Sequence, residues 1–280
     1  MTGGVIERGG WRLSLAGEDV IEAALRDAIV AAALNAASGS GARLQRRSRR
    51  ASTYVVRAGG ASEPGFFIKV IDAPRGFAKL KRGFSGSRAA HIQAISDAIR
   101  HAGLNAPPVV LWGRERSSGR ELVMTRGAPG VLATRYLRGA PLAGFARKRA
   151  LLRAAGAEIA RLHAAGFIHG DLTPFNIIAD ESPMISFIDH ERTRRVWFQR
   201  LAARARRRNL VQLGRFAFSG LTRSDRMRLW SSYAATMAPP LGRRELRLLL
   251  RMLDARIARA GALEISHPPQ IPAAGGVREA

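Results

Sequence analysis

The sequence predicts an α+β fold of two lobes, with a strand-rich first part followed by a mainly helical second part. Short apolar runs bounded by Gly and Pro dominate residues 1–126, whereas longer runs with helical periodicity dominate residues 127–265. The two patterns meet at a Gly- and Pro-rich stretch, which predicts a hinge and a cleft between the lobes. Residues 266–280 are rich in Pro, Gly and Ala, so we expect a flexible tail.

The composition favours a folded protein with a sizeable core, because 46% of the 280 residues are apolar. The chain has no cysteine, which excludes disulfides, thiolate metal sites and a cysteine nucleophile. No segment reaches the roughly 18–20 apolar residues that a membrane span requires. The N-terminus lacks the basic and then apolar pattern of a secretory signal. We therefore expect a cytoplasmic protein.

The net charge of +25 predicts attraction to anionic partners, namely nucleic acid, anionic lipid or phosphorylated sugars. The densest basic run is 194–208, which as a helix places Trp197 and Leu201 on one side and arginines around the rest. One interpretation is docking on the anionic face of a membrane, and the other is a helix with a solvated basic face. Aromatic residues do not alternate with the basic ones as in a stacking platform, so nucleic-acid binding is not expected.

The first lobe is predicted to contain two helices and five strands. The helix over residues 19–34 has Ile21, Leu25, Ile29 and Ala32 on one face. The other elements are strands at 46–50, 52–58 and 66–71, a helix over 87–101, and strands at 109–112 and 122–125.

The second lobe is predicted to begin with a long helix over residues 145–165 that ends before Gly166. Two short strands, at 175–179 and 184–188, flank a turn. Everything from residue 194 to about 260 has a helical pattern.

The stretch HGDLTPFNII, residues 169–178, follows the long helix and carries the chemistry. Asp171 is followed five residues later by Asn176, and Asp189 comes at the end of the next apolar strand. This is the pattern of a phosphoryl-transfer site, in which we expect Asp171 to orient the acceptor hydroxyl and take its proton. Asn176 and Asp189 supply the hard oxygen ligands that Mg²⁺ prefers. His169 is expected to pack and hydrogen-bond the loop.

Lys69 lies inside the apolar strand FFIKVI, where a lone ammonium group is costly unless it has an anionic partner. The phosphates of ATP are the partner we expect. The elements follow one another in a definite order: a strand with a Lys, a helix, two strands, a hinge, a helix, an Asp loop and a second Asp. The order resembles the protein-kinase-like fold, with a small antiparallel sheet in the N-lobe and a helical C-lobe.

Within that fold, four segments resemble the bacterial lipopolysaccharide kinase family, whose members phosphorylate Kdo or heptose of the inner core. They are HGD at 169–171, SFIDHERTR at 186–194, FSGSRAAHIQAI at 84–95 and RRNLVQLGRF at 207–216. The resemblance implies transfer of the γ-phosphoryl group of ATP, with Mg²⁺, to a hydroxyl of a core sugar. It also implies a lipid-linked core oligosaccharide as substrate, with peripheral contact at the cytoplasmic face of the inner membrane.

The sequence departs from the kinase pattern at three places. No Gly-x-Gly-x-x-Gly precedes the first strand, so residues 38–52, with Ser48 and Arg49, are the candidates for covering the phosphates. The helix over 87–101 lacks the Glu that should pair with Lys69, and its only acid is Asp97. Gln93 is a further candidate for that role. The helix over residues 19–34 has no place in the minimal fold.

Two other functions stay open. His-Gly-Asp-Leu-Thr also occurs in kinases of proteins and of small-molecule alcohols, so the acceptor class is not fixed. The missing Glu favours a different interpretation, a pseudokinase-like binding module held by its basic surface to a membrane or partner. His190 and Glu191 are interpreted either as substrate contacts or as part of a solvated loop.

Overall fold

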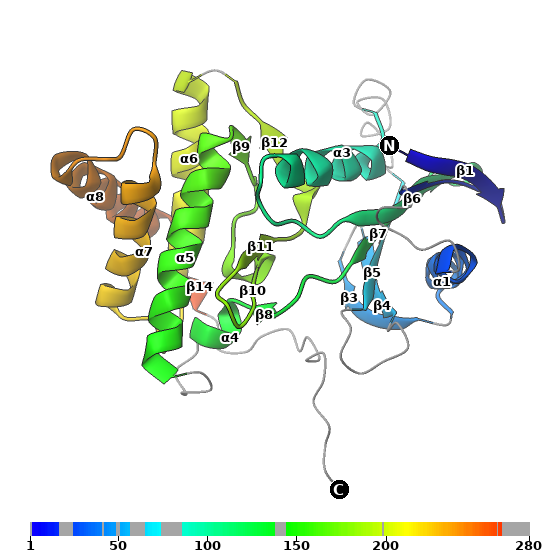
Figure 1. Cartoon of the computed structure of the whole chain (residues 1–280), viewed down its shortest axis with the longest axis horizontal. Coiled ribbons are helices and arrows are strands. Elements are labelled where there is room, and N and C mark those ends of the chain that lie inside the picture. The colour runs from blue at the N-terminus through cyan, green and yellow to red at the C-terminus, as the bar shows by residue number, and fades with distance from the viewer. Residues whose placement is uncertain are drawn as a thin grey trace, which may run out of the picture. The chain divides into compact units, whose positions relative to one another are not determined.

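A computed structural model describes residues 2–16, 25–40, 42–48, 51–56, 65–73, 86–137, 144–197, 199–261 and 263–264. The chain divides into two compact units, 1–98 with 107–128 and 271–280, and 99–106 with 129–270. The first unit holds the main sheet and the second is mainly helical (Figure 1). This confirms the predicted α+β class. The predicted lobe boundary stays a prediction, and the predicted tail over 266–280 lies outside the described residues.

The first unit is built on one sheet of seven strands, in which every pair of neighbours is antiparallel. The strand order is β1-β2-β6-β7-β5-β4-β3. Its elements are β1 (Thr2–Arg8), β2 (Trp11–Ala16), α1 (Arg26–Ser38), β3 (Arg43–Arg47), β4 (Ala51–Val56), β5 (Phe66–Ile71), α3 (Arg88–His101), β6 (Val109–Glu115) and β7 (Glu121–Arg126).

The β1–β2 hairpin was not predicted, and it makes the sheet larger than expected. β1 lies at the sheet edge and is mostly exposed, so its sequence lacks the apolar alternation that reveals a strand. The strand predicted at 46–50 is found at Arg43–Arg47.

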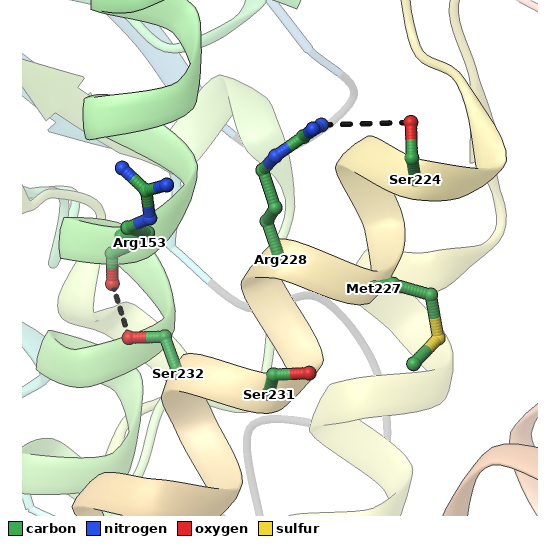
Figure 2. Close-up of a pocket in the computed structure, with 6 residues that line it drawn as sticks. All are labelled: Arg153, Ser224, Met227, Arg228, Ser231 and Ser232. Carbon is green, nitrogen blue, oxygen red and sulfur yellow. Dashed lines mark hydrogen bonds between the residues drawn. The ribbon is translucent and has the colours of Figure 1, made fainter.

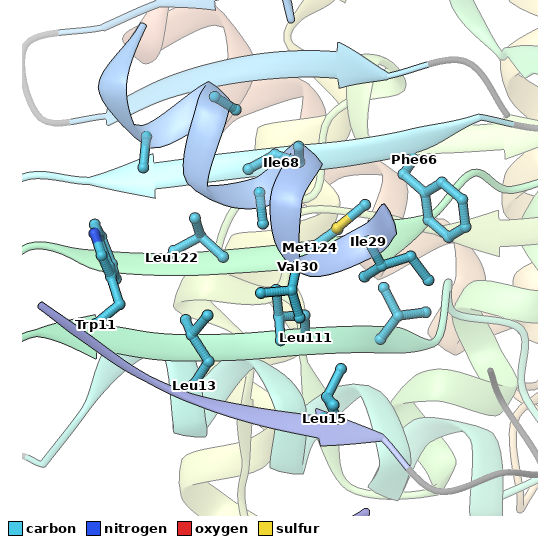
Figure 3. Close-up of a cluster of buried hydrophobic side chains, with 14 of the residues drawn as sticks. Trp11, Leu13, Leu15, Ile29, Val30, Phe66, Ile68, Leu111, Leu122 and Met124 are labelled. Atoms are coloured by element: carbon cyan, nitrogen blue, oxygen red, sulfur yellow. The ribbon is translucent and has the colours of Figure 1, made fainter. Parts of the chain in front are cut away.

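The N-terminal helix, which has no place in the minimal kinase fold, is α1, and it covers one face of the sheet (Figure 3). The helix was predicted over residues 19–34, and the structure has it at Arg26–Ser38. Its predicted buried face was partly wrong, because Ile29 is buried but Leu25 is 42% exposed and Ala32 is half-buried, while Ile21 lies outside the described residues. The buried residues form a stripe shifted from the predicted one. That stripe is rich in alanine, which lets the helix backbone approach the sheet closely. Its members are Ile29, Val30, Ala33, Ala36 and Ala37. They pack on Trp11, Leu13, Leu15, Ile68, Leu111, Leu122 and Met124.

Arg120 ties α1 to the sheet from the side. Its guanidinium pairs with the Glu115 carboxylate at 2.8 Å and donates to the backbone oxygen of Ala37 at 3.1 Å. The same group lies over the Trp11 ring, 5.7 Å from its centroid. The hydrogen bond to Arg120 lowers the pKa of Glu115, so the pair stays charged.

α3 packs on the opposite face of the sheet, where Ala89 and Ile92 contact Ile71 and Val123. Glu121, fully buried at the start of β7, fixes the beginning of this helix. Its Oε2 accepts the backbone N–H of Ala89 at 2.8 Å and the hydroxyl of Ser87 at 3.2 Å. A carboxylate suits this position because the first N–H groups of a helix have no partner within the helix.

The second unit consists of α5, α6, α7 and α8 with short strand pairs between them (Figure 1). β11-β10-β8 and β12-β9 are antiparallel, and β13-β14 is parallel. The elements are β8 (Val131–Leu132), α4 (Thr134–Leu137), α5 (Gly144–Ala164), β9 (Phe167–Ile168), η2 (Pro174–Asn176), β10 (Ile177–Ala179), β11 (Ile185–Phe187), η3 (His190–Arg192), β12 (Arg194–Arg195), α6 (Gln199–Gly214), β13 (Phe216–Ala217), α7 (Arg223–Thr236), α8 (Arg243–Ala260) and β14 (Leu263–Glu264).

The prediction that residues 194–260 are helical throughout was partly wrong. Arg194 and Arg195 form β12 by pairing with β9, and Phe216 and Ala217 form β13. Two-residue strands carry no periodicity of their own, and a partner from elsewhere in the chain creates them. In the part of the chain that the structure describes, no helix is both long and apolar enough to cross a bilayer.

α5 is the central helix of this unit and packs closely on α7. Gly156 makes the contact possible, because a Cβ at this position would lie 2.3 Å from the backbone oxygen of Leu229. Asp225 of α7 joins the two helices through Lys148 of α5 at 2.7 Å, and it also pairs with Arg228 of its own helix at 2.8 Å. Burial alone raises the pKa of Asp225, but hydrogen bonds from Lys148 and Thr222 outweigh it and lower the pKa to about 2.

The Asp225 carboxylate is therefore expected to stabilise the fold above about pH 4 and to lose this effect as the pH falls toward 2. Asp225→Asn should lower the free energy of unfolding by about 2 kcal/mol at pH 6, because the neutral amide no longer balances Lys148. The difference from the unmodified chain should shrink between pH 4 and pH 2 in denaturant titrations. Asp254→Asn, at an exposed position of α8, is the control and should show a small difference at every pH. If the difference in the free energy of unfolding between Asp225→Asn and the unmodified chain does not change with pH, this account is contradicted.

Candidate active site

The loop that begins at His169 has a backbone shape that only glycine allows at its second position. Gly170 has φ 75°, and a Cβ there would lie 2.3 Å from the backbone oxygen of Arg192. The chain after β11 therefore passes directly against this loop. The close approach explains why the motif reads His-Gly-Asp, since any larger residue would separate the two segments.

Asp171 is held from two directions. Gln212 of α6 donates from Nε2 to Asp171 Oδ1 at 2.7 Å. Asn176 donates from Nδ2 to the backbone oxygen of Asp171 at 2.8 Å and approaches Oδ2 at 3.4 Å. The carboxylate orientation is thus set by a helix and by the loop itself.

Gln212 was not identified as a site residue from the sequence. It lies in the run RRNLVQLGRF, which contributed only to the family resemblance. Its contact with Asp171 joins residues 41 positions apart, and helical periodicity within α6 cannot reveal such a pair.

Asn176 and Asp189 are brought to neighbouring backbone positions, because the backbone N–H of Ile188 donates to the Asn176 oxygen at 3.1 Å. Asn176 is buried, and its Nδ2 donates to the backbone oxygen of Asp171. The amide oxygen Oδ1 takes no part in this bond. Asp189 has φ 63°, the one positive φ at a non-glycine residue in the described part of the chain. Such a backbone is strained and often marks a functional position.

These two residues fit a magnesium ion by their chemistry, since an amide oxygen and a carboxylate are hard oxygen donors. Among the described residues, no group of three or more His, Asp or Glu could form an all-protein metal site. A magnesium ion held by Asn176 and Asp189 would draw its other ligands from phosphate or water oxygens, as is usual for this ion.

His169 is fully buried behind the loop. Its Nε2 donates to the backbone oxygen of Ile188 at 2.9 Å, and its backbone N–H donates to Asn209 Oδ1 at 3.0 Å. Burial lowers the pKa of His169, which keeps the ring neutral. These contacts agree with the structural role expected for this histidine.

His190 is neither a substrate contact nor part of a solvated loop, because its side chain is buried. Its Nε2 donates to the backbone oxygen of Phe187 at 3.0 Å, and Nδ1 lies 3.2 Å from the Thr193 hydroxyl. That hydroxyl donates to the backbone oxygen of His169 at 3.1 Å. The residues after Asp189 are thereby fixed to the loop that carries Asp171.

A buried polar chain connects α7 and α5 to the same loop. The hydroxyl of Tyr233 donates to His163 Nδ1 at 3.0 Å, and His163 Nε2 lies 3.4 Å from Asn209 Oδ1. Burial lowers the pKa of His163 to about 3 and raises the pKa of Tyr233 to about 12. Both groups stay neutral over the whole working pH range, so the chain is a fixed support.

Lys69 lies in β5 of the first unit, directly opposite Val123 of β7. Opposite residues of antiparallel strands share a sheet face. Ile71 and Val123 lie on the face that α3 covers, so Lys69 belongs to that face. On α3, Asp97 accepts a hydrogen bond from Gln93 at 2.5 Å. The predicted joint action of Lys69 with the loop of the second unit stays a prediction.

The predicted phosphate-covering residues receive no test from the structure. Ser48 follows β3, where its hydroxyl donates to the Ala51 oxygen at 3.0 Å and accepts the Ala51 N–H at 3.1 Å. These bonds join Ser48 to the first residue of β4. Arg49 lies outside the described residues.

An open pocket between α5 and α7 shares no lining residue with the loop (Figure 2). Its arginine Arg228 bonds Ser224 at 3.5 Å and Asp225 at 2.8 Å, and Ser232 donates to the backbone oxygen of Arg153 at 2.7 Å. The polar groups here join the two helices, so we assign this pocket a structural role.

Comparison with known protein families gives the family of the chain. The model of the lipopolysaccharide kinase (Kdo/WaaP) family matches residues 89–233, just over half of the chain. The chain belongs to the lipopolysaccharide kinase (Kdo/WaaP) family. No curated protein matches the chain. Membership confirms the predicted family and the protein-kinase-like fold, and it supports a phosphotransferase of lipopolysaccharide core sugars in general. The matched range contains Asp171, Asn176, Asp189 and Gln212, while Lys69 precedes it.

Gly170→Ala should disrupt the loop, because the added Cβ meets the Arg192 backbone and the positive φ is unfavourable. We expect a loss of stability of about 3 kcal/mol in thermal unfolding, together with loss of kinase activity. Gly144→Ala is the matched control, since Gly144 has φ 68° with open space around it. It should cost about 1 kcal/mol and leave activity intact. Equal effects of the two variants would mean that the Arg192 contact is unimportant.

Gln212→Leu removes the donor to Asp171 and keeps a similar side-chain volume. We expect kcat to fall about tenfold, because the carboxylate loses its fixed orientation, while the melting temperature changes little. Steady-state kinetics and thermal unfolding of the same preparation check this. A fall in kcat that merely follows a loss of folded protein would contradict a positioning role.

Proposed function

We propose that this chain transfers the γ-phosphoryl group of ATP to a hydroxyl of a lipopolysaccharide inner-core sugar, Kdo or heptose. The observation that carries the proposal is the orientation of Asp171 by Gln212 and Asn176, beside the strained Asp189, in a chain of this kinase family. Phosphoryl transfer depends mainly on positioning and charge neutralisation, which this arrangement supplies.

Asp171 is the general base of the proposed reaction. Its Oδ1 accepts the short bond from Gln212, whereas Oδ2 has only the long 3.4 Å approach of Asn176 Nδ2, so Oδ2 is proposed to receive the proton of the acceptor hydroxyl. The hydroxyl oxygen then attacks the γ-phosphorus, the bond from that phosphorus to the bridging oxygen breaks, and ADP leaves.

Asn176, through Oδ1, and Asp189, through its carboxylate, would hold Mg²⁺. When bound, this ion neutralises phosphate charge as the bridging bond breaks. Lys69 is proposed to bind the phosphates of ATP, and the segment with Ser48 and Arg49 is proposed to cover them. The assignments of Asn176 and Asp189 follow from residue chemistry and from the family, whose match contains both. Those of Lys69, Ser48 and Arg49, which precede the matched range, follow from residue chemistry and from the resemblance to the protein-kinase-like fold.

The proposed acceptor is a lipid-linked core oligosaccharide, reached by peripheral contact with the anionic cytoplasmic face of the inner membrane. Trp197 supports this proposal because it is 73% exposed and Arg195 lies over its ring, 4.0 Å from the centroid. An exposed tryptophan among arginines suits the interface of an anionic bilayer, and the net charge of +25 adds to the attraction.

A pseudokinase-like module is a second candidate, because the sequence of α3 contains no Glu that could pair with Lys69. ATP turnover separates this function from the first. A protein or small-molecule alcohol as acceptor is separated from a core sugar by an acceptor panel.

The test is phosphate transfer from labelled ATP, with Mg²⁺, to purified lipopolysaccharide core, beside protein and simple alcohol acceptors. We expect the core to be labelled, and Asp171→Asn to lower kcat at least about 100-fold while nucleotide binding persists. Asp254→Asn serves as the control and should retain full activity. Labelling of another acceptor class would overturn the core-sugar assignment, and nucleotide binding without any turnover would favour the pseudokinase.

A further inference from the structure

One side of α6 carries a row of arginines, which starts one turn from the residue that bonds the carboxylate of Asp171. Gln212, which bonds Asp171, is followed toward the N-terminus of the helix by Arg208 and Arg204 at steps of four residues. A step of four rotates about 40° and advances about 6 Å along the axis, so the three side chains lie on one side. Arg208 is therefore one turn from the residue that holds Asp171, and Arg204 is two turns away.

Both arginines are exposed, and neither has a carboxylate within 4.0 Å or a hydrogen-bond or ring partner among the described residues. Some other arginines of this unit are paired with carboxylates. Arg161 pairs with Glu158 at 2.6 Å, and Arg228 pairs with Asp225 at 2.8 Å. Arg204 and Arg208 have no such pairing among the described residues, so their charges are available to an anion.

A third arginine approaches Asp171 from the segment after Asp189. The Cβ of Arg192 lies 2.9 Å from the position of a Cβ built on Gly170, so its side chain starts next to the residue preceding Asp171. The Arg192 side chain is exposed and likewise lacks a partner among the described residues. Two separate elements therefore carry exposed arginines that start beside the loop of Asp171: the row on α6 starts next to Gln212, and Arg192 starts next to Gly170.

Unbalanced guanidinium groups near one another repel, and a bound anion relieves that repulsion. Guanidinium groups bind phosphate and carboxylate through paired hydrogen bonds, which adds geometric selectivity. We infer that Arg192, Arg204 and Arg208 form a subsite for phosphate or carboxylate groups of the acceptor. The inference rests on the proposed function, since it places these groups on the molecule whose hydroxyl meets Asp171. Arg208 and Arg204, being one and two turns from Gln212, bind groups remote from the reacting hydroxyl.

The subsite is tested with Arg192→Gln, Arg208→Gln and the Arg204→Gln/Arg208→Gln pair, using a deacylated core oligosaccharide that cannot bind membranes. Arg247→Gln, an exposed arginine of α8, is the matched control for loss of one positive charge. We expect each single change to raise the acceptor KM about tenfold, and the pair to raise it further, with the KM for ATP unchanged. After enzymatic dephosphorylation of the oligosaccharide, the rise in acceptor KM caused by each change should be smaller, because only the carboxylates remain to contact the arginines.

Calorimetric binding of the same oligosaccharide, without ATP, separates failure of the subsite from failure of the proposed function. Arginine-dependent binding without turnover would support the subsite and count against the kinase assignment. Turnover that is unaffected by all three changes would overturn the subsite and leave the kinase assignment standing. A rise in the KM for ATP alone would assign these arginines to nucleotide phosphates and overturn the proposal. Unchanged kinetics with weaker binding to vesicles of anionic phospholipid would assign them to the bilayer and overturn it as well.

Discussion

The hydrogen bond from the His169 backbone to Asn209 is the contact on which the candidate site depends. It fixes the start of the loop to α6, and three residues later on the same helix Gln212 fixes the Asp171 carboxylate. Asn209 is in turn held by His163, whose other nitrogen accepts from Tyr233. Because burial keeps His163 and Tyr233 neutral, no ordinary change of pH disturbs this support. The loop is thus positioned by groups that do no chemistry.

The sequence pointed to the candidate residues of the loop but not to the residues that support them, for a physical reason. Asp171 and Asn176 are five residues apart, so a local motif contains both. Gln212 and Asn209 reach the loop across 40 or more residues, and only tertiary packing brings them there. Gly170 lies between these two cases, since the sequence showed a glycine in the motif but not the reason for it. Its cause, the Arg192 backbone at 2.3 Å from a built Cβ, required the structure.

The first unit shows the same division between local pattern and tertiary partner. The strand of Lys69 was predicted with its correct bounds because apolar residues flank the lysine on both sides. The β1 strand and the buried face of α1 were not, since an exposed edge strand and an alanine-rich helix have weak patterns. Glu121 was also not singled out as the residue that fixes α3, although a buried carboxylate beside a helix start is its strongest structural feature. Of these residues, Glu121 bears on the face that carries Lys69, because it fixes the start of the helix that covers that face.

For charge, the structure adds information that the composition lacks. A net charge of +25 predicts an anionic partner but gives no place for it. The structure shows some arginines paired with carboxylates, such as Arg120 and Arg228, whereas Arg192, Arg204 and Arg208 have no carboxylate partner among the described residues. Paired arginines add little net field, because each is neutralised within a few ångströms. Arginines without such a partner contribute more, and these three lie on the elements that contact the loop of Asp171. The base proposed at Asp171 would gain from this arrangement, since the same arginines would attract the acceptor and fix its direction of approach.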